Sequence, residues 1–193
     1  MSISQGSPTI KFGREFPFYT AVADQTVKVR LMGAEDAEAM LAFGRSLPEE
    51  DLFFLRVDIT DPDVVAEWIR HIKAGNTVSV VAESNGEIVG YANLHYQELR
   101  WTRHLGEIRI QVSPAWRGRG LGRLLLREVF QVAQHLGLRK IVARMASSQR
   151  GARVVFESIG FEAEALLADA VIDSHGRTQD LILMSYDVTG FVT

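Results

Sequence analysis

The chain has 193 residues, of which 47% are hydrophobic and 23% charged, with a net charge of -3. These values fit a single domain with a sizeable core and argue against a nucleic-acid partner. The sequence contains no cysteine, which excludes disulfides, thiolate metal sites and a cysteinyl acyl-enzyme. Residues 1–10 lack signal-peptide features and no apolar run approaches the roughly 20 residues of a membrane span, so we expect a cytoplasmic protein without a membrane partner.

The first third of the chain predicts an arm, a strand and two helices. Aromatic residues among glycine and proline over 1–25 predict an extended N-terminal arm packed on the domain. Alternating apolar residues predict a strand over 26–32, and helical spacing predicts a helix over 33–47. Asp61 followed by Pro62 is typical of the start of another helix.

The rest of the chain alternates strands and helices. Asn85-Gly86 predicts a hairpin turn between two apolar segments. A strand over 106–112 runs into a glycine-rich turn and then into an amphipathic helix. The amphipathic helix is expected over 120–136. The other strands are expected over 77–83, 87–95, 140–146, 163–172 and 178–186.

The glycine-rich turn predicts a phosphate or pyrophosphate site. Gly118, Gly120 and Gly122 are spaced by two, between the strand and the helix N-terminus. Such a turn exposes backbone N–H groups, and the helix dipole adds positive potential. Glycine also allows the backbone to approach an anion closely. Formal positive charge comes from three arginines of the same segment, Arg117, Arg119 and Arg123.

The spacing distinguishes among phosphate-binding loops. No Gly-Lys pair occurs in the chain, which excludes a Walker loop, and position 123 is Arg where a dinucleotide fingerprint starting at Gly118 requires glycine. The observed pattern is Arg-x-x-Gly-x-Gly from Arg117 to Gly122. A second segment, Gln149 to Phe161, follows after one predicted helix and one strand.

Together these two segments resemble the GCN5-related N-acetyltransferase superfamily. Its cofactor loop has the pattern Gln/Arg-x-x-Gly-x-Gly/Ala, and its next motif is Asn-x-x-Ala-x-x-x-Tyr-x-x-x-Gly-Phe. The resemblance implies a single α/β (α+β) domain over 26–187, with a mixed, mostly antiparallel sheet of six to seven strands, about four helices and a C-terminal tail over 188–193. A plain strand–helix turn is the alternative for the loop taken alone.

The resemblance implies acetyl-CoA as the acyl donor and no metal. The pantetheine arm would pair with the strand ahead of the loop, and the splay between this strand and the next would make its slot. The backbone N–H near Val112 would bind the oxyanion. The cofactor-binding residues expected on this basis are Ile110, Gln111, Val112, Arg117, Gly118, Arg119, Gly120, Leu121, Gly122, Arg123, Gln149 and Phe156.

The resemblance implies that Glu107 is the candidate general base, because it matches within a residue the position where histone-type members of the family have a glutamate base. It lies on the strand ahead of the loop, and we expect burial beside the acyl slot to raise its pKa. A surface glutamate and a base acting through a water chain are the alternatives. Phe156 stands where many members have a tyrosine that protonates the leaving thiolate. Arg144 stands where enzymes that acetylate ribosomal-protein N-termini have a glutamate, which argues against that subfamily.

The resemblance implies transfer of an acetyl group to a primary amine by direct attack in a ternary complex. The amine site would be built from residues 45–56 and 166–177. The amine could belong to a small molecule, which we favour, or to a peptide or protein. An acyl-CoA-binding module with little activity, and a transferase for a different acyl group, are the alternatives. The last hairpin could also pair two copies as a homodimer.

Overall fold

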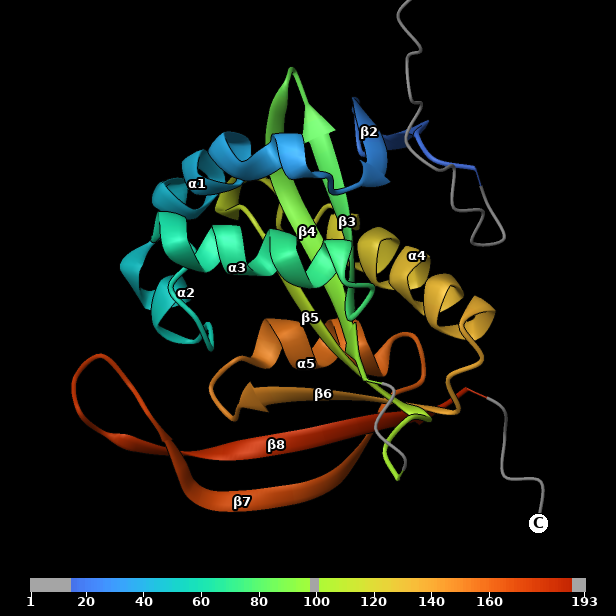
Figure 1. Cartoon of the computed structure of the whole chain (residues 1–193). Helices are drawn as coiled ribbons and strands as arrows, with labels where there is room; N and C mark the ends of the chain where they lie inside the picture. The colour runs from blue at the N-terminus through green and yellow to red at the C-terminus, as the bar shows by residue number, and fades with distance from the viewer. Residues whose placement is uncertain (1–14, 98–100, 189–193) are drawn as a thin grey trace, which may run out of the picture.

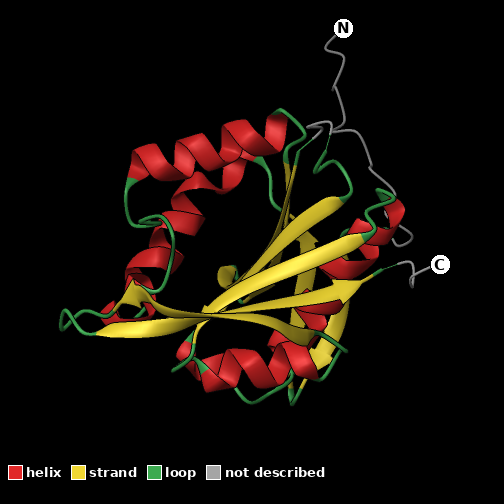
Figure 2. Cartoon of the chain, turned by 90° about the horizontal axis from the view of Figure 1, so that it is seen from below, coloured by secondary structure: helices red, strands yellow, loops and turns green. Residues whose placement is uncertain are grey.

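A single mixed sheet organises the described residues, 15–97 and 101–188, of the computed structural model. The strand order is β1-β2-β3-β4-β5-β6-β8-β7, and helices cover both faces (Figures 1 and 2). This confirms the predicted fold class, with one strand more than expected. The strands are β1 Phe18–Val22, β2 Gln25–Leu31, β3 Thr77–Ser84, β4 Glu87–Tyr96, β5 Leu105–Val112, β6 Lys140–Ala146, β7 Glu162–Ile172 and β8 Thr178–Asp187.

The additional strand comes from the segment expected to be an extended arm. β1 pairs antiparallel with β2, from Phe18 opposite Val29 to Val22 opposite Gln25. It therefore belongs to the sheet, at its edge. Residues 1–14 of the expected arm and 189–193 of the expected tail lie outside the described residues.

Five α-helices lie among the residues that the structure describes, where about four helices were expected. The additional helix is α2, which is too short to produce a helical periodicity in the sequence. The predicted N-cap is confirmed, because the Asp61 side chain accepts a hydrogen bond from the N–H of Asp63 at 2.8 Å. The helices are α1 Ala37–Ser46, α2 Glu49–Phe53, α3 Pro62–Lys73, α4 Leu121–His135 and α5 Arg150–Glu157.

Two hydrophobic clusters lie on opposite faces of the sheet because side chains alternate along its central strands. α1 and α3 pack on one face, where Val81 and Tyr91 point toward them. α4 packs on the other face, against Val80 and Ala92. Figure 1 shows α1 and α3 on one side of β3 and β4 and α4 on the other. The central strands are thus held from both sides.

The sheet opens between its two parallel strands. β5 and β6 pair over only three positions, from Leu105 opposite Lys140 to Glu107 opposite Val142. Beyond them, residues 108–112 of β5 have no described strand partner on that side. In Figure 1, β6, β8 and β7 run in a clearly different direction from β3 and β4. The splay expected beside the glycine-rich loop is therefore present.

β7 lies at the far edge of the sheet and pairs on one side with β8. Its apolar side chains Leu166, Leu167 and Ile172 are exposed. A free edge of this kind can pair with another strand. The homodimer stays a prediction.

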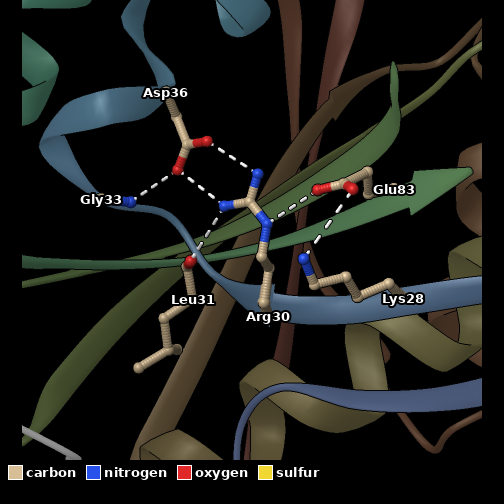
Figure 3. A network of polar contacts seen from close by, with 6 residues as sticks. All are labelled: Lys28, Arg30, Leu31, Gly33, Asp36 and Glu83. Carbon is tan, nitrogen blue, oxygen red and sulfur yellow. Dashed lines mark hydrogen bonds and ion pairs between the residues drawn. The ribbon is translucent and has the colours of Figure 1, made fainter. Parts of the chain in front are cut away.

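A polar network joins β2 to the turn before α1 (Figure 3). Arg30 donates two hydrogen bonds of 2.7 Å to the carboxylate of Asp36 and one of 2.9 Å to Glu83. Asp36 also accepts the backbone N–H of Gly33 at 2.7 Å. Burial alone would raise the pKa of Asp36, but Arg30 and the Gly33 N–H hold it below its ordinary value. Asp36 is therefore ionised and fixes the chain as it leaves the sheet.

Asp36→Ala should lower the free energy of unfolding by about 3 kcal/mol, because it leaves the half-buried Arg30 guanidinium and the Gly33 N–H without their acceptor. Urea unfolding measures this loss. The control is Glu67→Ala on α3, which removes an exposed pair with Arg70 and should cost at most about 1 kcal/mol. Equal losses in the two variants would contradict a structural role for the network.

Candidate active site

The glycine-rich loop takes a backbone conformation that only glycine adopts readily. Gly118 has a φ of 71° and Gly120 a φ of 89°, both left-handed. Gly120 is the N-cap of α4, and the first N–H groups of a helix have no partner within it. No heavy atom lies within 4 Å of the position of a Cβ at Gly118 or Gly120. Both glycines are thus required by backbone conformation and leave open space above the helix N-terminus.

The loop arginines hold the loop itself. Arg117 donates from Nε to the carbonyl of Val112 at 3.1 Å and pairs with Asp51 of α2 at 2.5 Å. Arg123 donates to the hydroxyl of Ser158 at 3.1 Å. The Arg119 guanidinium lies 3.8 Å from Asp24. The structure therefore gives each arginine a protein partner, and anion binding by the loop backbone stays a prediction.

Backbone groups of β5 face the opening between β5 and β6. The N–H of Ser113 donates to the carbonyl of Val89 on β4 at 3.0 Å. The backbone N–H and C=O groups of successive residues in an antiparallel strand point alternately toward and away from a given neighbour. Since the Ser113 N–H points toward β4, the N–H and C=O groups of Val112 and Ile110 point away from it. Gln111, between them, lies opposite Tyr91. An extended chain lying in the opening could pair with Ile110 and Val112 and reach the first turn of α4.

Three other expected cofactor residues contribute little side-chain surface to the opening. Leu121 is fully buried in the core. Phe156 is 3% exposed, and its ring packs on Phe161 with centroids 5.0 Å apart. The Gln149 side chain accepts the N–H of Ala146 at 2.9 Å. Gln149 therefore fixes the connection between β6 and α5, and Phe156 packs α5 against the residue that precedes β7.

A cavity of about 780 Å³ lies on the α1–α3 face of the sheet, beside the opening. Arg56, from the segment expected to bind the amine, lines it. Residues 166–177, also expected there, do not appear among the described residues that line it. Polar and charged side chains of β4 and β5 form its floor, namely Asn93, His95, Glu107 and Arg109.

The prediction of a raised pKa for Glu107 is wrong. Burial alone would raise it, but Arg109, Arg144 and Arg56 together hold the pKa below its ordinary value. Arg109 donates to Glu107 Oε1 at 3.1 Å, and Arg56 lies 3.4 Å from the same atom. Glu107 is therefore an ionised carboxylate between two arginines that face the cavity.

Sequence reasoning missed His95, which lies directly opposite Glu107. Burial and the charge of Arg109 lower the pKa of His95 to about 4, so the ring is neutral at neutral pH. Its Nδ1 lies 2.9 Å from the Thr77 hydroxyl. The signal was available, because polar residues alternate with Ala92 and Leu94 in an otherwise apolar strand.

Within residues 15–97 and 101–188, no group of three or more His, Asp or Glu side chains is arranged to hold a metal ion. No helix in the described part of the chain is long and apolar enough to cross a membrane.

Comparison with known proteins places these features in a family. Residues 43–161 match the Acetyltransferase (GNAT) family. The chain is 30% identical over 125 residues to the L-amino acid N-acyltransferase MnaT of Escherichia coli, covering 64% of this chain and 72% of that protein. It is 31% identical over 106 residues to the L-methionine sulfoximine/L-methionine sulfone acetyltransferase of Salmonella typhimurium, covering 54% and 61%.

A solved structure shows the same fold. The GNAT superfamily phosphinothricin acetyltransferase of Sinorhizobium meliloti, in complex with acetyl-CoA, superposes with a TM-score of 0.73 at 24% identity. The alignment covers 83% of this chain and 88% of that one.

Proposed function

The chain belongs to the GNAT acetyltransferase family, and from this premise we propose that it transfers the acetyl group of acetyl-CoA to the amino nitrogen of a free amino acid. The observation that carries the proposal is the pairing of charges in the cavity. The Glu107 carboxylate suits an ammonium group, while Arg56 and Arg109 suit a carboxylate. A free amino acid carries both groups. The two relatives are named for acyl transfer to amino acids, which supports the same substrate class.

In the proposed mechanism the pantetheine arm lies along β5 and its thioester reaches the opening beside Glu107. The bound ammonium group first loses one proton to solvent water. The neutral amine nitrogen then attacks the thioester carbonyl carbon, and a backbone N–H of β5 near Val112, that of Ile110, donates to the oxyanion that forms. The amine proton passes to Glu107, directly or through a water. The C–S bond then breaks and the thiolate leaves.

Phe156 has no proton to give to that thiolate, and its ring is buried. A thiolate is a good enough leaving group to depart unassisted, because a thiol is far more acidic than an amine. The buried Phe156 and the ionised Glu107 also suit the second candidate, a module that binds acyl-CoA and turns it over slowly.

The test is release of CoA thiol from acetyl-CoA with a panel of amines, with the product identified by mass spectrometry. We expect amino acids to give α-N-acetyl products, and their decarboxylated analogues to react about tenfold more slowly in kcat/KM because they lose the pairing with the arginines. Equal rates for the two would rule out the amino-acid substrate. Binding of acetyl-CoA without turnover of any amine would favour the binding module.

A further inference from the structure

Two buried polar atoms at the floor of the cavity have no hydrogen-bond partner among the residues that the structure describes. They are Oδ1 of Asn93 and Nε2 of His95. Asn93 is 5% exposed. The two residues are separated by one position on β4, so their side chains share one face of the sheet, and both line the same cavity. A buried polar atom without a partner costs stability. A ligand group that reaches these two atoms from the cavity could therefore supply the missing partner.

Trp68 also lines the cavity, but it offers no polar group to a ligand. Its indole N–H donates to the Ser79 hydroxyl at 2.9 Å, so it presents only its ring to the cavity. Asn93 and His95 thus present polar atoms beside the Trp68 ring, on a floor that also carries Glu107 and Arg109. A ligand group that reaches them must match their hydrogen-bonding capacity.

The register of β4 and β5 places these atoms beyond the amine site. His95 is opposite Glu107, and Asn93 is opposite Arg109. Asn93 is therefore a diagonal neighbour of Glu107, and diagonal neighbours on antiparallel strands lie about 7–8 Å apart. An amino acid whose nitrogen contacts Glu107 could direct a side chain of medium length toward Asn93.

The chemistry of the two atoms defines the group that fits. Oδ1 of Asn93 is an acceptor and requires a donor. His95 is neutral, and its Nδ1 is held by Thr77, so Nε2 is a donor in one tautomer and an acceptor in the other. A group that carries both a donor and an acceptor without charge satisfies Asn93 and either tautomer of His95. A carboxamide or a sulfoximine has this property, whereas a carboxylate has no donor for Asn93.

We propose that Asn93 and His95 form a recognition site for an uncharged donor–acceptor group at the end of the substrate's side chain. This inference rests on the proposed amino-acid acetylation and specifies which amino acids the same site prefers. The groups that face His95 are Thr77, Glu107, His71 and the cationic Arg109 and Arg56. Asn93 and His95 act as specificity residues, and the amine chemistry stays with Glu107.

The experiment compares kcat/KM for glutamine, glutamate and norleucine, which share the amino and α-carboxylate groups. We expect the wild-type protein to prefer glutamine by about 10- to 100-fold over the other two. Asn93→Leu removes the acceptor at similar volume and should bring the glutamine-to-norleucine ratio close to one. His95→Leu should lower the same ratio, and it decides the question if Asn93→Leu does not fold. The control is Gln97→Leu at the exposed rim of the cavity, which should keep the wild-type ratio.

The outcomes separate this inference from the proposed function. Acetylation of all three amino acids without preference for glutamine overturns the recognition site and leaves amino-acid acetylation in place. A wild-type ratio retained by both folded variants overturns it as well. Absence of any acetylated product overturns the proposed function, and this inference with it.

Discussion

Glu107→Gln should lower kcat for amino-acid acetylation by about 100- to 10,000-fold, the range for loss of a general base. The variant keeps the size of the side chain but removes the group that accepts the amine proton. Affinity for acetyl-CoA should not change, because the loop and the backbone of β5 are untouched. Steady-state kinetics and calorimetric titration with acetyl-CoA measure the two quantities separately. The control is Glu67→Gln, which changes a carboxylate that lines the same cavity but pairs with Arg70 and His71.

The pH dependence of the reaction follows from the arginines around Glu107. Because its pKa is lowered, the carboxylate stays ionised as pH falls, and kcat/KM should show no titration of Glu107 between about pH 5 and 8. Arg109→Gln removes the first of the cationic neighbours that lower it. The pKa of Glu107 should then rise, and the loss of activity in acid should begin at a higher pH.

For the first prediction, a Glu107→Gln variant with wild-type kcat would show that Glu107 is not the base.

The lowered pKa of Glu107 also predicts how the free energy of unfolding depends on pH. An ionised Glu107 stabilises the fold at pH values above the ordinary glutamate pKa, and this contribution is lost as pH falls through the lower folded-state value. The wild-type protein should therefore lose more stability on acidification than Glu107→Gln does. Urea unfolding at a series of pH values measures the difference.

Gly120→Glu should weaken acetyl-CoA binding by about 100-fold or more, as expected for a like charge placed against an anion. The new carboxylate would lie at the N-terminus of α4, where the proposed pyrophosphate site is. The left-handed conformation of Gly120, with a φ of 89°, would also be strained by any side chain. Calorimetric titration with acetyl-CoA measures the effect.

Gly137→Glu is the matched control for that variant. Gly137 follows α4, has a φ of 70°, and has no heavy atom within 4 Å of the position of a Cβ, as is true of Gly120. It therefore reproduces the backbone penalty and the added charge away from the loop. Equal acetyl-CoA affinities in the two variants would contradict a role for the loop in binding the cofactor.

Local patterns in the sequence predicted the parts of the fold that depend on local residues. Gly120 takes the left-handed conformation at the start of α4, and the Asp61 side chain caps the start of α3. Both effects depend on the residue type and its immediate neighbours in the sequence. β1 was not recognised as a strand, because its partner β2 supplies the pairing that defines it. α2 was missed because five residues are too few for a helical period.

The electrostatics of the candidate site could not be predicted in the same way. The pKa of Glu107 depends on Arg56, which lies 51 residues earlier in the chain, and on Arg144 from β6. Only the folded sheet brings these charges together. Asn93 and His95 were visible as polar residues in an apolar strand, but the cavity that they line is formed by α3 and the segment before it.

Thermal unfolding with and without acetyl-CoA tests the central claim, that the loop and the opening between β5 and β6 bind this acyl donor. Ligand at about 100 times its dissociation constant should add about 2.7 kcal/mol to the free energy of unfolding. For a domain of this size, that corresponds to a rise in Tm of about 5–10 °C. We expect this rise in the wild-type protein and in Gly137→Glu, and its loss in Gly120→Glu. An unchanged Tm for the wild-type protein at millimolar acetyl-CoA would contradict the assignment of the site.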